Sequence, residues 1–227
     1  MSHFKICLVF CGILLMSNPI SQASIIIDAG FEDPNSNSNS TMGFTLTGDA
    51  DADVLTPEID PAIEGMESLR LVGNGDPTGM ARFSQAFQDV PVDGVTISVG
   101  NQVVLTGDLA QLSGDPLTED NRAFLEIAFV DSAGAVFQGQ GAFLSAVIDS
   151  ASPVDSFQSL ATAAAIVPAG AAQVRVLAVF DEQTVNSGVN SGAVFVDNLE
   201  LVVTVPEPGS AAVLAAALVM IFARRRR

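Results

Sequence analysis

The carboxylates of Glu58, Asp60 and Glu64, in the segment EIDPAIE, are the side chains best suited to acid–base chemistry. Hydrolysis of a glycosidic bond with retention of configuration needs two carboxyl groups about 5 Å apart, and one face of a β-strand can supply that spacing. The three residues share the parity of one strand face. Pro61 interrupts such a strand because proline cannot donate a hydrogen bond to the neighbouring strand. The segment therefore favours an acidic loop, with a glycosidase that uses these three carboxylates as the alternative.

Other catalytic chemistries need residue types that the exported chain lacks. The only histidine, the only lysine and both cysteines fall within the first 23 residues: His3, Lys5, Cys7 and Cys11. That segment has a basic start, an apolar centre and a small-residue end at Ala23, an order typical of a secretory signal peptide. After its removal no Ser-His-Asp triad, Cys-His pair, Schiff-base lysine or His- or Cys-ligated zinc site can form. The sequence therefore predicts a protein that is not an enzyme.

The exported part of the chain is strongly acidic. Residues 24–223 contain four arginines and all 26 acidic residues, so their formal net charge is −22. Such a field repels nucleic acid and anionic surfaces, and it attracts cations. The sequence therefore argues against nucleic acid as a partner. It favours surroundings of high ionic strength, in which the self-repulsion is screened.

Apolar and polar residues alternate with period two through most of residues 24–204, as Val174, Val176, Ala178 and Phe180 illustrate. This pattern is typical of β-strands, and no segment of the body has a helical period. Nine strands are predicted, over residues 24–31, 42–47, 67–72, 80–88, 101–110, 122–131, 156–166, 172–180 and 192–203. The predicted fold is a single all-β domain, a two-sheet antiparallel jelly-roll sandwich large enough to fold without disulfides.

Six segments, in order, resemble the galactose-binding-like jelly roll of bacterial carbohydrate-binding modules. They are IIIDAGFEDP (25–34), GMESLRLVG (65–73), RFSQAF (82–87), FLEIAFVDSAGAVF (124–137), VPAGAAQVRVLAVF (167–180) and GAVFVDNLELVV (192–203). The resemblance implies the same fold. Sugar binding in such modules relies on flat Tyr and Trp platforms, but this chain has neither residue, and most of its 14 phenylalanines fall at alternating strand positions typical of a core. Sugar binding through a Phe or polar groove stays an alternative.

The segment from Glu58 to Asp60 also resembles the Glu-Ile-Asp motif of laminarinase-like glycosidases. These enzymes are jelly rolls that carry a second Glu shortly after the motif. Glu64 stands too far along the chain to match that Glu, and the body is small for the family. A non-enzymatic protein therefore stays the prediction.

Asp197 lies in the last predicted strand, with the parity of Phe195 and Leu199. A charged carboxylate at an inward strand position is costly unless it is paired. A loop amide, an arginine or a structural calcium ion can pair it. In the resembling modules, a Glu in a Gly-Phe-Glu segment of the first strand and an Asp of the last strand take part in such a site, and Glu32 and Asp197 match these positions. The resemblance implies one structural calcium ion held by Glu32, Asp197 and backbone carbonyls that include that of Ser68.

The C-terminal segment 205–227 combines three parts in a fixed order. They are Val205, Pro206, Glu207 and Pro208; the uncharged stretch Ala211 to Ala223; and Arg224, Arg225, Arg226 and Arg227. A helix of 13 residues spans about 20 Å, short of the roughly 30 Å hydrocarbon core, and snorkelling arginines bring it near a marginal span. The arginine cluster indicates a cytoplasmic stop, with the body outside. The segment is therefore predicted to be a short transmembrane helix.

This order resembles the PEP-CTERM sorting signal of bacteria that make extracellular polysaccharide. The resemblance implies export by the general secretion machinery, transient membrane anchoring and recognition by an exosortase that cleaves near Pro-Glu-Pro. The predicted organisation is a signal peptide at 1–23, a β-sandwich domain at 24–204 and a sorting signal at 205–227. The predicted function is an exported, non-enzymatic protein of the cell surface or exopolysaccharide matrix. A carbohydrate-binding module of that matrix is the alternative.

Overall fold

The computed structural model describes residues 25–26, 44–47, 55–59, 67–72, 82–137, 142–182 and 192–205. The described residues form twelve strands: β1 Thr45–Thr47, β2 Leu55–Ile59, β3 Glu67–Val72, β4 Arg82–Pro91, β5 Gln102–Ala110, β6 Arg122–Val130, β7 Phe143–Leu144, β8 Ile148–Asp149, β9 Gln158–Ala161, β10 Ala165–Ile166, β11 Gln173–Glu182 and β12 Ala193–Thr204. The predicted signal peptide, and the sorting signal beyond Val205, lie outside them. Within these ranges no helix has the length and apolar character needed to cross a membrane.

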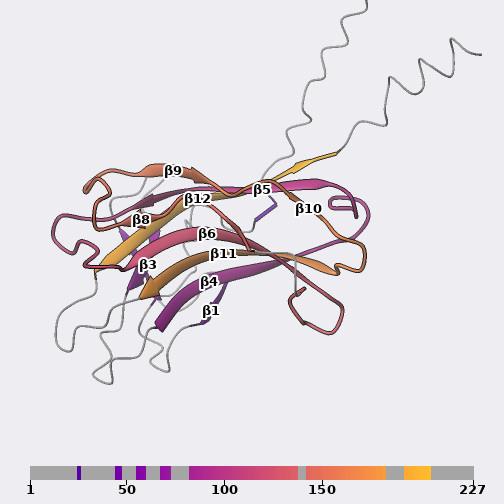
Figure 1. The fold of residues 1–227 in the computed structure, drawn as a ribbon, viewed down its shortest axis with the longest axis horizontal. Coiled ribbons are helices and arrows are strands. Elements are labelled where there is room, and N and C mark those ends of the chain that lie inside the picture. Colours follow the sequence, from indigo (N-terminus) through magenta and orange to yellow (C-terminus); the bar gives the residue numbers. More distant parts are fainter. Residues whose placement is uncertain are drawn as a thin grey trace, which may run out of the picture.

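The strands pair into two antiparallel sheets that form a sandwich (Figure 1). Sheet A has the order β1-β4-β11-β6-β7, with β8 also paired to β6. Sheet B has the order β10-β5-β12-β3-β2, with β9 also paired to β5. The chain changes sheet repeatedly: between β1 and β2, between β3 and β4, on either side of β5, between β8 and β9, and on either side of β11. The predicted two-sheet antiparallel β-sandwich is confirmed.

The period-two pattern decides which side chains face the core between the sheets. On β11, Val174, Val176, Ala178 and Phe180 are buried in the main core cluster. On β6, the odd-numbered residues from Ala123 to Phe129 belong to the same cluster. Successive side chains of a strand point to opposite faces. The even-numbered residues of β6 and the odd-numbered residues of β11 therefore lie on the outer face of sheet A.

Most of the predicted strands are present with small changes at their ends. Predicted strands 67–72, 80–88, 101–110, 122–131, 172–180 and 192–203 correspond to β3, β4, β5, β6, β11 and β12. Predicted strand 42–47 is seen at 45–47 as β1. Residues 25–26, from the predicted strand 24–31, are not in a strand, and the rest of that strand lies outside the described residues.

Two further differences have local causes. Predicted strand 156–166 is divided into β9 and β10, and between them the Thr162 hydroxyl accepts a hydrogen bond from the Leu105 N–H at 3.0 Å. Strand β2 was not predicted because Pro57 lies inside it. The order of sheet B places β2 at an edge, where a proline is tolerated. β7 and β8, also not predicted, have two residues each.

An irregularity in β12 shifts the parity of its side chains. The pairing of β12 with β5 jumps between Asp197 and Glu200, and Asn198 has a positive φ of 51°. Val196 joins the main core cluster before this bulge, and Leu199 joins it afterwards. The prediction that Asp197 shares a face with Leu199 is therefore wrong. Asp197 lies on the outer face of sheet B, although it is fully buried.

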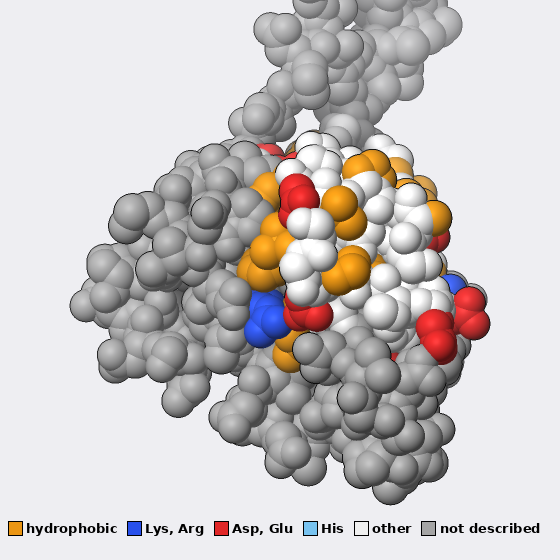
Figure 2. All heavy atoms as spheres, turned by 90° about the vertical axis from the view of Figure 1, so that its left-hand side faces the viewer, with side chains coloured by type: hydrophobic (Ala, Val, Ile, Leu, Met, Phe, Trp, Pro, Cys, Tyr) orange, Lys and Arg blue, Asp and Glu red, His pale blue; other side chains and the backbone are white. Residues whose placement is uncertain are grey.

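The sandwich has two ends that differ in character. At the tail end, Thr204 of β12 lies opposite Gln102 of β5, and the connections 92–101, 131–137 and 167–172 lie at this end. At the other end, the acidic end, lie the connections 111–121 and 150–157. These two connections contain four acidic residues and no basic residue. Figure 2 views the molecule from the acidic end and shows acidic side chains at its surface.

Candidate binding face

A second apolar cluster covers the outer face of sheet A, separate from the main core. Phe124 of β6 and Leu177 and Val179 of β11 are buried and pack together, and the partly buried Phe87 and Ala128 pack against them. These five residues form the outer cluster. Leu177 lies opposite Phe87 of β4, and Val179 lies opposite Phe124. Because their positions alternate with core residues, the sheet itself separates the two clusters.

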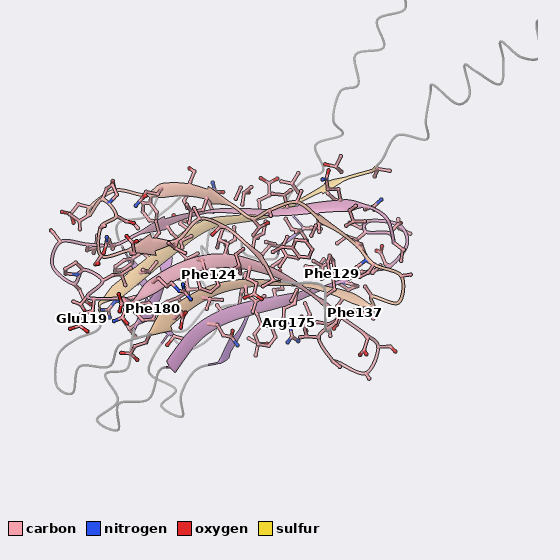
Figure 3. All side chains as sticks on the ribbon, in the orientation of Figure 1. Glu119, Phe124, Phe129, Phe137, Arg175 and Phe180 are labelled. Atoms are coloured by element: carbon pink, nitrogen blue, oxygen red, sulfur yellow. The ribbon has the colours of Figure 1, made fainter. Side chains whose placement is uncertain are left out.

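Two ion pairs border the outer cluster. The Nε and Nη2 atoms of Arg175 each donate a hydrogen bond to the Asp89 carboxylate at 2.7 Å, and these bonds raise the pKa of Arg175. Its guanidinium lies 4.2 Å from the ring centroid of Phe87. Arg122 donates to one oxygen of Asp181 at 3.0 Å through Nε and at 2.8 Å through Nη2. Figure 3 labels Arg175 and Phe124 on sheet A, with Phe180 toward the acidic end.

Glu126 is a half-buried carboxyl group beside the outer cluster. It lies opposite Leu177 on β11 and opposite Leu144 on β7. Burial raises its pKa. Arg175 and Arg122, on the same face, each form an ion pair with an aspartate instead. Glu126 therefore combines an acidic group with largely apolar neighbours.

The outer face of sheet A can bind an amphipathic ligand. The partly buried Phe87 and Ala128 offer apolar surface, packed against the buried Phe124, Leu177 and Val179. The ion pairs offer fixed donors and acceptors at its border. Acid–base catalysis with retention would need two carboxyl groups about 5 Å apart in suitable protonation states. Asp89 and Asp181, which border the cluster, are held by arginines. Asp149 on β8, opposite Arg122, accepts hydrogen bonds from Ala151 and Ser152. The arrangement therefore favours binding over glycoside hydrolysis.

Two of the three residues predicted to bind calcium come close together. Asp197 and Ser68 are both fully buried. Val196 of β12 pairs with Leu69 of β3, which places Asp197 and Ser68 at adjacent positions on neighbouring strands. Glu32 lies outside the described residues. Among the described residues, no three His, Cys, Asp or Glu side chains are grouped so that they could hold a metal ion.

Sequence reasoning missed Asp108, which lies directly opposite Asp197 on β5 and is also buried. Asp108 accepts hydrogen bonds from the Ser159 hydroxyl and, at 3.1 Å, from Asn198 Nδ2. One carboxylate oxygen of Asp197 accepts the Asn198 N–H at 2.7 Å. Two carboxylates and a hydroxyl are oxygen donors that suit a hard cation such as calcium. The chemistry of the residues present fits the predicted ion, with Glu32 needed to extend the set.

The remaining predicted residues are placed only in part. Glu58 lies on β2, opposite Ser68 of β3. Asp60 and Glu64 lie outside the described residues, so the structure does not test the alternative carboxylate set. Val205 follows the last residue of β12 and is half exposed. Pro206, Glu207, Pro208 and the four terminal arginines lie outside the described residues.

In the sequence, the outer cluster appears only as apolar residues on the second face of two predicted strands. Phe124, Leu177 and Val179 are apolar residues on the second face of strands that already had an apolar core face. Such two-sided strands are typical of the inner strands of a layered sheet. Which of the two faces would meet the other sheet depends on pairings between distant segments.

No family model matches the sequence, and no curated protein matches it. Among solved structures, the chain is similar to a Stig cyclase from Fischerella sp. TAU in complex with an indole compound, with a TM-score of 0.53 and 13% identity over 82% of this chain and 100% of that chain. A cyclase from the same organism, in complex with another indole compound, has a TM-score of 0.53 and 16% identity over the same shares. Both support the β-sandwich fold, and the fold alone.

Two other neighbours have lower scores. The CBM22-1 xylan-binding domain of Xyn10C from Paenibacillus barcinonensis has a TM-score of 0.48 and 12% identity, over 78% of this chain and 93% of that chain. The enzymatically active domain of bacteriophage CBA120 tailspike protein 4 has a TM-score of 0.46 and 16% identity. The match covers 71% of this chain but only 19% of the tailspike chain. None of these likenesses assigns an activity.

Proposed function

We propose that the chain is an exported, non-enzymatic protein of the cell envelope or its polysaccharide matrix, and that the outer face of sheet A binds a polysaccharide. The observation that carries the proposal is the outer cluster, an apolar cluster outside the main core whose partly exposed members are Phe87 and Ala128, bordered by the Arg175–Asp89 and Arg122–Asp181 pairs. This observation favours the carbohydrate-binding alternative over a matrix protein without sugar affinity.

A sugar chain has the chemistry that this face would recognise. A pyranose ring presents apolar C–H groups on one side and hydroxyl groups around its edge, so it suits an apolar floor with polar groups at the border. Phe87, the partly exposed ring of the outer cluster, supplies aromatic surface in place of the Tyr and Trp that the chain lacks. Arg175 has five N–H donors, and its pair with Asp89 uses two of them.

The absence of catalysis is part of the proposal. The exported residues contain no His, Cys or Lys. Glu126 is the carboxyl group on this face with a raised pKa, and the carboxylates bordering the cluster are bound to arginines. These facts support binding without turnover.

The C-terminal tail supports delivery to the envelope. Its order of Pro-Glu-Pro, apolar segment and arginine cluster resembles a PEP-CTERM signal, which implies an exosortase as partner. Val205, the first residue of that signal, is half exposed at the tail end of the sandwich. A motif that begins at the surface suits recognition by a processing enzyme.

We also propose one structural calcium ion, held by Asp197, Glu32 and oxygen atoms that include the Ser68 carbonyl. The burial of Asp197 opposite Asp108 supports this site, because two carboxylates facing each other in a chain of net negative charge suit a divalent cation. The ion would tie the last strand to the beginning of the body.

Affinity electrophoresis of residues 24–204 in gels that contain soluble xylan, mixed-linkage β-glucan or a bacterial exopolysaccharide tests the binding proposal. We expect retardation by at least one polysaccharide. Phe87→Leu and Arg175→Met should each weaken binding about tenfold, which corresponds to about 1.4 kcal/mol. The matched control Val154→Ala changes an exposed residue at the acidic end and should bind as the parent does.

Three results would contradict the proposal. Retardation that both folded variants retain in full would place the sugar site elsewhere. Mobility unchanged by every polysaccharide would leave a matrix protein without sugar affinity. Release of reducing sugar, abolished by Glu58→Gln or Glu126→Gln, would overturn the non-enzymatic assignment.

A further inference from the structure

Exposed apolar side chains gather at the tail end of the sandwich. The structure describes eight large hydrophobic residues that are exposed, and five of them belong to the connections or strand ends of the tail end. These five form the apolar collar: Val95 (87% exposed), Val99 (53%), Val136 (41%), Ile166 (62%) and Val205 (50%). Single exposed valines are ordinary, but a concentration at one end of a monomer indicates an interaction surface.

The turn that carries Val95 is held in a fixed shape. The Asp93 carboxylate accepts hydrogen bonds from the backbone N–H groups of Val95 (2.8 Å), Thr96 (2.7 Å) and Ile97 (3.3 Å). Gly94, at a φ of 75°, donates its N–H to the Ile97 carbonyl at 2.9 Å. Ile97 is buried in the main core. The exposure of Val95 is therefore imposed by a turn anchored in the core.

The two ends also differ in charge. The tail-end connections 92–101, 131–137 and 167–172 contain only Asp93 and Asp131 as charged residues. Both carboxylates accept hydrogen bonds within their own turns, and Asp131 is bound by the N–H groups of Ala133 (2.8 Å) and Ala135 (3.0 Å). The two connections of the acidic end contain four acidic residues, and one of them, Asp115, is paired with Arg70.

The distance between the ends matters for electrostatics. β12 has 12 residues and runs from the acidic end to the tail end, and at about 3.3 Å per residue it spans roughly 36 Å. The Debye length at physiological ionic strength is about 8 Å. A charged surface in contact with the tail end is therefore screened from the acidic end. The net charge of the body does not forbid such a contact.

The predicted membrane-inserted segment begins close to the tail end. β12 ends at Thr204, and Ala211, the first residue of the uncharged 13-residue stretch, is six residues beyond Val205. Six residues span at most about 20 Å even when fully extended. A tail inserted in a bilayer thus keeps the tail end within about 20 Å of the lipid surface.

We propose that the apolar collar rests on the phospholipid surface while the tail is inserted, so that the sandwich stands with its tail end on the bilayer and its acidic end outward. The collar then lies at the boundary between the lipid headgroups and the acyl chains, where uncharged Val and Ile side chains are buried. This orientation rests on the membrane anchoring in the proposed function. It also leaves the outer face of sheet A, which runs between the two ends, open to the surroundings.

Site-specific fluorescence tests the orientation in the full chain. Because the only cysteines are Cys7 and Cys11, replacing both by alanine makes every new cysteine a unique label site. Val95→Cys and Ile166→Cys report on the collar, Ala216→Cys reports on the tail, and the exposed Val154→Cys at the acidic end is the matched control. Each variant carries an environment-sensitive dye and is reconstituted in phosphatidylcholine vesicles with or without nitroxide-labelled lipid.

We expect nitroxide lipid to quench the labels at Val95 and Ile166 at least twofold more than the label at Val154, and to quench Ala216 most. Quenching at Ala216 with Val95 and Ile166 equal to Val154 would overturn the orientation and leave the anchor intact. Absence of quenching at Ala216 would refute the anchor, and the orientation with it. The collar labels could instead show a blue shift without quenching, and this shift could disappear when residues 211–227 are deleted. That result would mean that the tail covers the collar, and it would also overturn the proposal.

Discussion

The outer faces of the two sheets differ in the groups that bind their buried and half-buried carboxylates. On sheet A, Asp89 and Asp181 are each matched by an arginine from a neighbouring strand. On sheet B, Asp108 is held by the neutral donors Ser159 and Asn198, with Asp197 directly opposite. Four arginines serve 26 acids between residues 24 and 223. Arg70 on β3 is paired with Asp115, so arginine pairing also occurs on sheet B. What distinguishes sheet B is a pair of buried carboxylates, Asp108 and Asp197, that lie opposite each other and suit a cation.

Removing the charge at Asp197 should produce the largest effect. Extracellular calcium modules bind at roughly 0.1 to 1 mM, so about 10 mM calcium with a dissociation constant near 0.1 mM stabilises the fold by about 2.7 kcal/mol. Each kcal/mol moves the Tm of a domain of this size by about 2–4 °C. Thermal melting of residues 24–204 should therefore show a rise of about 5–10 °C with calcium, and Asp197→Asn should lose it.

Magnesium at matched ionic strength is the control, because screening of the acidic surface also stabilises the fold. If magnesium reproduces the whole calcium effect, or if Asp197→Asn retains it, the calcium site does not exist. The contrast between the two sheets would then lose its functional meaning.

Breaking the arginine–aspartate pairs of sheet A should have the next largest effect. The Arg175–Asp89 bond is bidentate, and its side chains are 22% and 24% exposed, so Arg175→Met should lower the unfolding free energy by about 1 kcal/mol. The matched variant Arg122→Met should cost more, about 2 kcal/mol, because the Asp181 side chain is only 3% exposed and would lose the arginine that binds it. Urea unfolding measures both values. Equal losses of unfolding free energy in the two variants would show that burial of the aspartate does not decide how much each pair stabilises the fold.

The bulge beside Asp197 predicts a smaller, conformational effect. Asn198 has a left-handed backbone, which glycine adopts freely and alanine adopts at a cost of about 1 kcal/mol. Asn198→Gly and Asn198→Ala both lose the hydrogen bond to Asp108. The alanine variant should therefore be less stable than the glycine variant by about 1 kcal/mol in urea unfolding. A reversed order would contradict the observed backbone.

The smallest effect should depend on pH and concerns Glu126. Burial raises its folded-state pKa, so the folded protein holds this proton more tightly than the unfolded chain does. The resulting stabilisation is complete below the unfolded pKa of about 4.3 and is lost as the pH rises through the folded pKa. Glu126→Gln should thus raise the Tm at pH 7 relative to the parent and lose this advantage near pH 4. A gain that is the same at both pH values would rule out this ionisation as its cause.

The sequence was informative where a residue depends on its near neighbours. The alternation in β11 and β6 predicts both the strands and the face that enters the core. The alternation in β12 could not reveal the bulge after Asp197. A bulge is an extra residue relative to the paired strand, and the pairing of β12 with β5 is not visible in the sequence. Asp108 and the outer cluster were missed for the same reason. Asp108 faces Asp197, and the residues of the outer cluster meet one another, only because strands far apart in the chain are paired.

One consequence of the strand order in sheet B concerns the timing of export. β12, the last strand, lies between β5 and β3, so these two strands cannot be joined before residues 193–204 are available. A chain threaded outward from its N-terminus therefore waits with its sheet in two halves, each with an unpaired edge. The uncharged stretch at 211–223 follows within a few residues. If the chain is exported as proposed, closure of the fold and arrival of the proposed sorting signal at the membrane fall at nearly the same moment, and a truncated chain would lack both.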